Sequence, residues 1–230
     1  MKMPAAVAVV LIVLGWPASM PAQTPPGVNA ATAAQITKAR RANAALMRQY
    51  TWYSRVEIVE KGTVQDLRLE LVNYGPGGNL QRNTVNNQSA PLPFGFIRRK
   101  IAERDRARIE QYLMGLRSLV EQYTLPSEGH VLDFMNEATI SGPDASGLLE
   151  MTGQNVVYPG DALTVWTDAR TRQTRRVQAT TVFQGDPVDL TATFKTLKSG
   201  LTYMAFGEAI VPAKELSVQV QNFDYNRNNN

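Results

Sequence analysis

The stretch ALTVWTDARTRQTRRVQATTVFQGDPVDLTATFKT, residues 162–196, decides the fold of this chain. It contains three segments rich in β-branched and aromatic residues, 162–169, 174–184 and 188–195, separated only by short polar turns. Strands this close together pair only as antiparallel neighbours, because a parallel crossover needs about a dozen residues between them. The stretch therefore predicts an antiparallel meander.

Strand-like segments continue on both sides of this stretch. Towards the C-terminus they cover 201–206 and 216–225, and towards the N-terminus 148–158 and 139–141. Further upstream, 50–60 and 64–74 alternate with period two around a turn at Lys61 and Gly62, which predicts a hairpin. Residues 79–87 are more polar, and they predict a third strand at the edge of the sheet.

Two regions have helical periodicity instead. An amphipathic helix is expected from Asn29 or Thr32 to about Gln49. The strongest helical pattern covers 96–122, where Gly115 is a weak point of about 1 kcal/mol. Residues 126–129 end that helix and open a short second one over 130–135, with Ser127 as its cap.

Two groups of strands separated by a helical pair, with one helix in front, predict an α+β fold. A sheet of about ten twisted strands curls. We therefore expect a curved antiparallel β-sheet, an unclosed barrel, covered on its concave face by helices. Residues 23–225 are expected to form a single domain, followed by a disordered polar tail at 226–230.

The N-terminus has the order of a secretory signal peptide. Lys2 precedes an apolar run over 5–16, and a segment with small residues and prolines leads to a cleavage site near Ala22. The apolar run is too short to span a bilayer, and nothing later in the chain approaches the required ~20 residues. The chain has no cysteine, which leaves no lipid anchor and no disulfide. We expect a soluble protein of the bacterial periplasm, or one otherwise exported, after removal of residues 1–22.

Several phrases of the C-terminal half carry a resemblance to a known group. They are YPGD at 158–161, VWTD at 165–168 followed by Thr171, RRVQAT at 175–180, Gly185 with Val188, and VQVQNFDY at 218–225. The sequence resembles the superfamily of periplasmic lipoprotein carriers, which includes the LolA and LolB carriers, the RseB-type stress regulators and outer-membrane lipoprotein-sorting-like proteins. The long, Arg-rich helical pair departs from the carriers, so a carrier's partner-binding residues do not map onto this chain.

The resemblance implies a half-barrel whose interior shelters an apolar ligand, a lipid or the acyl chain of a lipoprotein. A concave apolar surface is physically suited to this, because each buried methylene contributes about 0.8 kcal/mol. The candidate wall residues are Trp52, Ile58, Leu69, Leu113, Leu116, Met135, Val165, Trp166, Phe183, Phe194, Tyr203 and Phe206. The same residues also fit an ordinary filled core, since 43% of the chain is apolar.

The residue inventory argues against an enzyme. One histidine and no cysteine exclude His-rich metal sites and thiolate nucleophiles, so no metal and no cofactor are expected. His130 has no serine in a nucleophile elbow. Asp161 and Asp168 could form a carboxylate pair, but each lies in a turn signature where an aspartate caps the backbone.

An alternative to the apolar ligand is an envelope sensor or adaptor that uses the Arg-rich helix 96–122. In that reading Arg98, Arg99, Arg104 and Arg108 meet anionic head groups or an acidic partner, although interleaved acids also fit a solvated face. The expected partners are a lipid or acylated protein and possibly envelope proteins. The formal net charge of +4 is too mild to indicate nucleic acid, and we expect a monomer.

Overall fold

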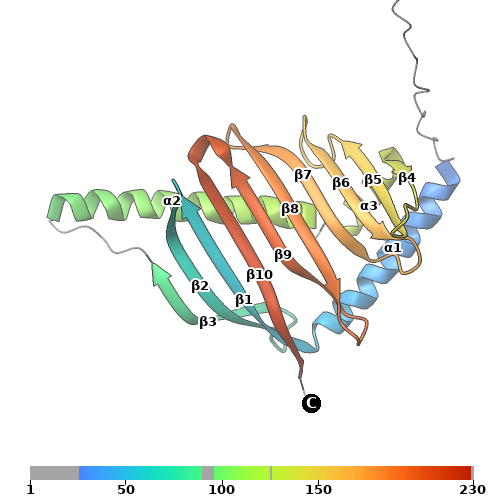
Figure 1. The fold of residues 1–230 in the computed structure, drawn as a ribbon, viewed down its shortest axis with the longest axis horizontal. Helices are drawn as coiled ribbons and strands as arrows, with labels where there is room; N and C mark the ends of the chain where they lie inside the picture. The colour runs from blue at the N-terminus through green and yellow to red at the C-terminus, as the bar shows by residue number, and fades with distance from the viewer. Residues whose placement is uncertain (1–25, 90–95, 125, 229–230) are drawn as a thin grey trace, which may run out of the picture.

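A computed structural model describes residues 26–89, 96–124 and 126–228, and the predicted signal peptide lies outside these ranges. Ten strands form one antiparallel sheet in the order β3-β2-β1-β10-β9-β8-β7-β6-β5-β4. The two edge strands, β3 and β4, do not pair with each other, so the sheet is an unclosed, curved barrel (Figure 1). The predicted α+β class and antiparallel sheet are confirmed.

The strands are β1 (Tyr50–Glu60), β2 (Thr63–Tyr74), β3 (Leu80–Ser89), β4 (Thr139–Ser141), β5 (Leu148–Gln154), β6 (Ala162–Asp168), β7 (Thr174–Phe183), β8 (Asp186–Thr196), β9 (Thr202–Val211) and β10 (Leu216–Arg227). The helices are α1 (Pro26–Met47), α2 (Phe96–Thr124) and α3 (Glu128–Glu137), with a 3-10 turn, η1, at Pro212–Lys214. Strands β4 to β10 form the predicted meander, and β1 pairs antiparallel with β10, which joins the N-terminal hairpin to it.

Several strand boundaries differ from the sequence-based expectation; β9, for example, runs to Val211 rather than ending at residue 206. Strand β5 ends at Gln154 rather than at residue 158, because the next residues turn around the carboxylate of Asp161. Strand β8 begins at Asp186, because Gln184 and Gly185 alone make the turn, both with positive φ. Strand β10 continues to Arg227, which pairs with Tyr50, so the first two residues of the predicted polar tail belong to the sheet.

The helices pack on one face of the sheet, called here the inner face. Figure 1 shows α2 crossing behind the strands. Alternate residues of most strands point to this face and form one core with the helices, whereas β3 is exposed along its whole length. The core's helical members include Ile36 of α1, Leu116 and Tyr123 of α2, and Phe134 and Met135 of α3.

The main contacts between helices and strands lie on one half of the sheet. They join α2 to β7 and α3 to β5, and α1 packs mainly against α3. None of these main contacts involves β1, β2 or β3. The main helical contacts are therefore with the β5–β8 half of the inner face.

Candidate functional site

A cavity of about 990 Å³ lies between the inner face and the helices. Its strand wall includes Met151 of β5, Val165 of β6, Val177 of β7 and Leu190 of β8, which are spaced to share one face of the sheet. Its helical wall, opposite those strands, includes Leu113 and Leu116 of α2 and Met135 of α3. This part of the cavity presents hydrocarbon on both sides.

The β1–β3 part of the cavity wall is charged. Arg68, Glu70 and Arg82, called here the charged wall, line the cavity from β2 and β3. The guanidinium of Arg82 lies 2.8 Å from a carboxylate oxygen of Glu70, and Arg68 forms an ion pair with Asp66. The cavity therefore joins an apolar end to an end with paired charges.

Aromatic rings cluster at one end of the strands beside the charged wall, a feature that the sequence analysis missed except for Trp52 and Tyr203. The rings of Trp52 and Tyr225 are stacked, with centroids 5.3 Å apart and an interplanar angle of 8°. Tyr203 lies 4.2 Å from Tyr225, and Tyr74 lies 6.1 Å from Trp52, both between ring centroids. These residues come from β1, β2, β9 and β10, so only the strand order β2-β1-β10-β9 brings them together.

Eight of the twelve predicted wall residues line the cavity. They are Trp52, Ile58, Leu113, Leu116, Met135, Val165, Phe194 and Tyr203. The other four, Leu69, Trp166, Phe183 and Phe206, are not among its lining residues.

Three of these four lie on the outer face of the sheet. Trp166 follows the inward-facing Val165, so alternation turns it outward, where its indole nitrogen donates to Glu150 over 3.0 Å. Leu69 pairs with Arg55 of β1, and Phe206 pairs with Gln221 of β10, both in outward register. For Leu69, Trp166 and Phe206 the predicted place in the wall is wrong.

Phe183 lies on the inner face but belongs to the packing beneath α2. Its ring meets the ring of Tyr112 edge to face, with centroids 5.0 Å apart. A Cβ atom at Gly115 would lie 2.5 Å from the tip of the Phe183 ring. The glycine in α2 thus leaves room for this ring, which fills space that the cavity would otherwise occupy.

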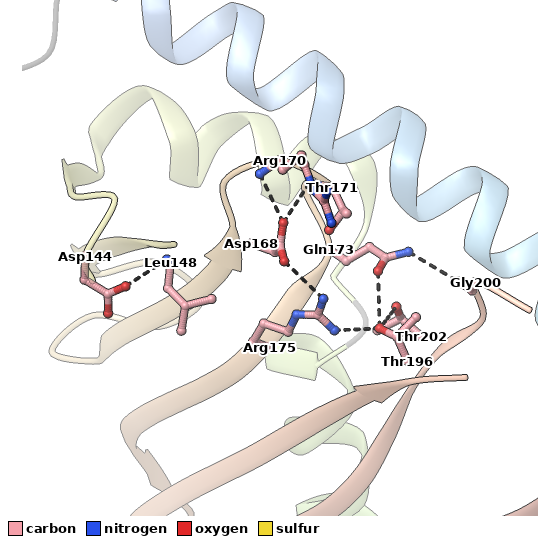
Figure 2. Close-up of polar contacts among 10 residues, drawn as sticks. All are labelled: Asp144, Leu148, Asp168, Arg170, Thr171, Gln173, Arg175, Thr196, Gly200 and Thr202. Carbon is pink, nitrogen blue, oxygen red and sulfur yellow. Dashed lines mark hydrogen bonds and ion pairs between the residues drawn. The ribbon is translucent and has the colours of Figure 1, made fainter. Parts of the chain in front are cut away.

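The two aspartates considered as a carboxylate pair both hold turns. The carboxylate of Asp168 accepts hydrogen bonds from the backbone N–H groups of Arg170 and Thr171 and from the guanidinium of Arg175 (Figure 2). The Thr171 N–H, together with Arg175, lowers the pKa of Asp168 to about 2 against the opposing effect of burial. The motif therefore fixes the β6–β7 turn.

Asp161 has the same function at the β5–β6 turn, but deeper. It is 2% exposed, and its carboxylate accepts from the N–H groups of Val156, Val157 and Tyr158 and from the Tyr123 hydroxyl. Burial acts to raise its pKa, but these donors outweigh it, so the pKa lies below the usual value. The hydroxyl of Tyr123 also reaches Thr181, which ties α2 to β7.

The remaining polar candidates are placed as follows. Ser127 caps α3, as predicted, by accepting from the backbone N–H of His130. Arg108 is exposed on α2, whereas the side chains of Arg98, Arg99 and Arg104 lie outside the described residues. Among the side chains that the structure describes, no group of three or more histidine or acidic residues could hold a metal ion.

Comparisons with known proteins give distant structural likenesses only. No family model and no curated protein matches the sequence. Among solved structures, a DUF1329 family protein from Desulfovibrio piger matches with a TM-score of 0.36 and 10% identity, over 89% of this chain and 94% of that one. A LolA superfamily protein from Nitrosomonas europaea has a TM-score of 0.37 and 7% identity, over 85% and 94%.

A putative outer membrane lipoprotein-sorting protein domain from Vibrio parahaemolyticus has a TM-score of 0.36 and 10% identity, over 84% of this chain and 91% of that one. Two of the three matches carry names from the group that the sequence resembles. At these values they assign the chain to no family.

Proposed function

We propose that this chain is an exported binding protein that shelters an apolar ligand, a lipid or the acyl chain of a lipoprotein, between its sheet and its helices. The observation that carries the proposal is the cavity of about 990 Å³ between the inner face of the sheet and the helices. Ligand sites in proteins occupy roughly 300–1,000 Å³, whereas voids within packed interiors rarely exceed a water molecule. A space of this size fits a ligand better than a packing defect.

The chemistry of the wall supports an acyl chain as the occupant. Transfer of about 15 methylenes from water to an apolar site contributes roughly 12 kcal/mol. Association itself costs about 4–15 kcal/mol, so one chain reaches an affinity of about micromolar at the low end of that cost. The hydrocarbon of Leu116, Val165 and Leu190 supplies such a site.

Export is part of the proposal and depends on residues 1–22, whose sequence has the order of a signal peptide. Within residues 26–89, 96–124 and 126–228, no helix has the length and hydrophobicity to cross a bilayer. Asp161 and Asp168 each accept hydrogen bonds from the backbone of a turn and so stabilise the fold. This supports a binding role over catalysis.

The test is binding of a fluorescent fatty acid to the protein purified after export, together with native mass spectrometry for a co-purified lipid. Two matched variants on β1 separate the cavity from the outer face. Val56 lines the cavity. Val59 lies on the opposite face of β1, next to the bulge after Ile58. Val56→Trp should weaken binding at least about tenfold by occupying the cavity, and Val59→Trp should leave it within about twofold.

Wild-type protein that binds no fatty acid and carries no lipid would contradict the proposal. So would equal binding by the two variants, because the probe would then lie outside the cavity.

A further inference from the structure

Strand β2 places its charged side chains on the inner face of the sheet and its leucines on the outer face. Its register with β1 places Asp66 opposite Ile58 and Arg68 opposite Val56, both of which point to the inner face. The charged residues of β2 therefore face inward, and its three leucines face outward. A sheet that only packed against helices would bury the leucines and expose the charges. The reversal indicates that this part of the cavity is built for a polar group.

The four charged side chains of β2 and β3, the three of the charged wall together with Asp66, balance one another. Arg82 pairs with Glu70 and Arg68 with Asp66, and the two acidic side chains are only 13% and 11% exposed. The hydroxyl of Ser89 also donates to Asp66 over 2.9 Å. Two cations and two anions sum to zero. A ligand with a single charge would leave one of these sheltered partners unpaired, which is costly away from bulk water.

The aromatic rings lie beside the charged wall, at one end of strands β2, β1, β10 and β9. Tyrosine and tryptophan suit a place that borders both charged and apolar side chains, because each combines an apolar ring with a hydrogen-bonding group. Burial raises the pKa of Tyr225, with smaller effects from Tyr203 and Tyr74, so its phenol stays protonated and able to donate. Along the inner face, hydrocarbon on β1 and β10 leads directly to the paired charges of β2 and β3, which is the order of an amphiphile from its tail to its head.

We propose that the charged wall binds the zwitterionic head group of a phospholipid, one that carries both a phosphate and an ammonium, while the acyl chains lie at the apolar end. The phosphate would accept from the guanidiniums of Arg68 and Arg82, and the ammonium would donate to Glu70. Arg82 and Glu70 then exchange each other for the phosphate and the ammonium, and Arg68 keeps its Nε hydrogen bond to Asp66, so none of the four charges is left unpaired. The inference rests on the proposed function, since it names the class of ligand for the same cavity.

The experiment compares three lipids with identical chains, using the mature protein produced with its own leader. They are dioctanoylphosphatidylethanolamine, which is zwitterionic, dioctanoylphosphatidylglycerol, which is anionic, and dioctanoylglycerol, which has no charge. We expect the zwitterionic lipid to bind about tenfold more tightly than either of the others, the effect of one good charge-assisted contact.

Substitutions in the wall should remove that preference selectively. In Arg82→Gln and in Glu70→Gln the advantage of the zwitterionic lipid should fall to about twofold or less, with dioctanoylglycerol binding unchanged. The double exchange Arg82→Glu with Glu70→Arg keeps the wall neutral and should restore part of the preference. The control is Arg55→Gln, which breaks the Arg55–Glu57 ion pair of 2.7 Å on the outer face and should have no effect.

Equal binding of the three lipids, a preference for the anionic lipid, or an unchanged preference in both single variants would overturn the head-group assignment and leave the proposed function standing. Binding of none of the three lipids would instead overturn the proposed function itself.

Discussion

At the residue scale, the buried carboxylate of Asp161 holds the turn between β5 and β6. Its buried carboxylate accepts hydrogen bonds of 2.6–3.0 Å from three backbone N–H groups and from Tyr123. Asp161→Asn would turn one acceptor oxygen into a donor that faces these donors. We expect a loss of about 2–4 kcal/mol in the free energy of unfolding, measured by urea denaturation.

The matched control is Asp189→Asn, which removes the same charge from an exposed position on β8. It should change the free energy of unfolding by about 0.5 kcal/mol or less. Similar losses in the two variants would mean that net charge, rather than the hydrogen bonds of Asp161, determines the result.

The same two turns predict the response to acid. The pKa of Asp161 and of Asp168 is lowered in the folded state, that of Asp168 to about 2, from an unfolded value near 4. A lowered pKa contributes stability that is complete above the unfolded value and is lost as the pH falls towards the folded value. The urea midpoint should therefore be level from about pH 7 to 5 and fall steeply between about pH 4 and 2.

Asp168→Asn should flatten that fall, because the substituted side chain does not titrate. An equally steep fall in this variant would show that other carboxylates cause the acid response.

At the element scale, Gly115 determines how α2 lies on the sheet. Gly→Ala in a helix interior usually stabilises by about 1 kcal/mol. Here the new Cβ would lie 2.5 Å from the ring of Phe183, which already packs against Tyr112. We expect Gly115→Ala to destabilise by about 1–3 kcal/mol, measured by thermal or urea unfolding.

A double-mutant cycle tests the cause. In the background Phe183→Leu the shorter side chain leaves room, so the added Gly115→Ala should be neutral or stabilising. A loss of the same size in both backgrounds would place the conflict elsewhere than at Phe183.

The elements that sequence could predict are those with strong local signals. The hairpin at β1–β2, the edge position of β3 and the meander from β4 to β10 all follow from period-two alternation and from the shortness of the turns. The end of β5 at Gln154 could not be predicted in the same way, because the side chain that turns the chain, Asp161, lies seven residues further on.

The candidate site was harder to predict, and for two different physical reasons. Val165 and Trp166 are adjacent in one strand, so alternation alone excludes a shared face, and the sequence contained the signal that Trp166 points outward. Leu69 is different. Its strand alternates leucines with charges, and the rule that apolar residues face inward gives the wrong face. Only the register with β1, which includes a bulge between Ile58 and Val59, shows that Leu69 lies on the outer face.

At the scale of the whole molecule, the uneven cover of the sheet explains why a space remains. The helices gather over the half of the inner face from β5 to β8, and the pairing of β1 with β10 extends the same face beyond them. The side chains of β2 and β3 give that part of the inner face its charged character, and those of β1 add apolar surface beside it.

This arrangement predicts opposite effects for one substitution at two places on the inner face. Val165 of β6 lines the cavity, whereas Val188 of β8 does not and is 1% exposed in the packed core. Val165→Phe adds apolar volume where there is room, and it should stabilise the ligand-free protein by up to about 1 kcal/mol while weakening ligand binding. Val188→Phe should destabilise by about 1–3 kcal/mol through overpacking.

Differential scanning calorimetry of both variants without lipid measures the sign of the change in stability. If the interior were solidly packed, both substitutions would lower the melting temperature, so the sign at Val165 distinguishes an unfilled interior from a filled one without reference to any particular ligand.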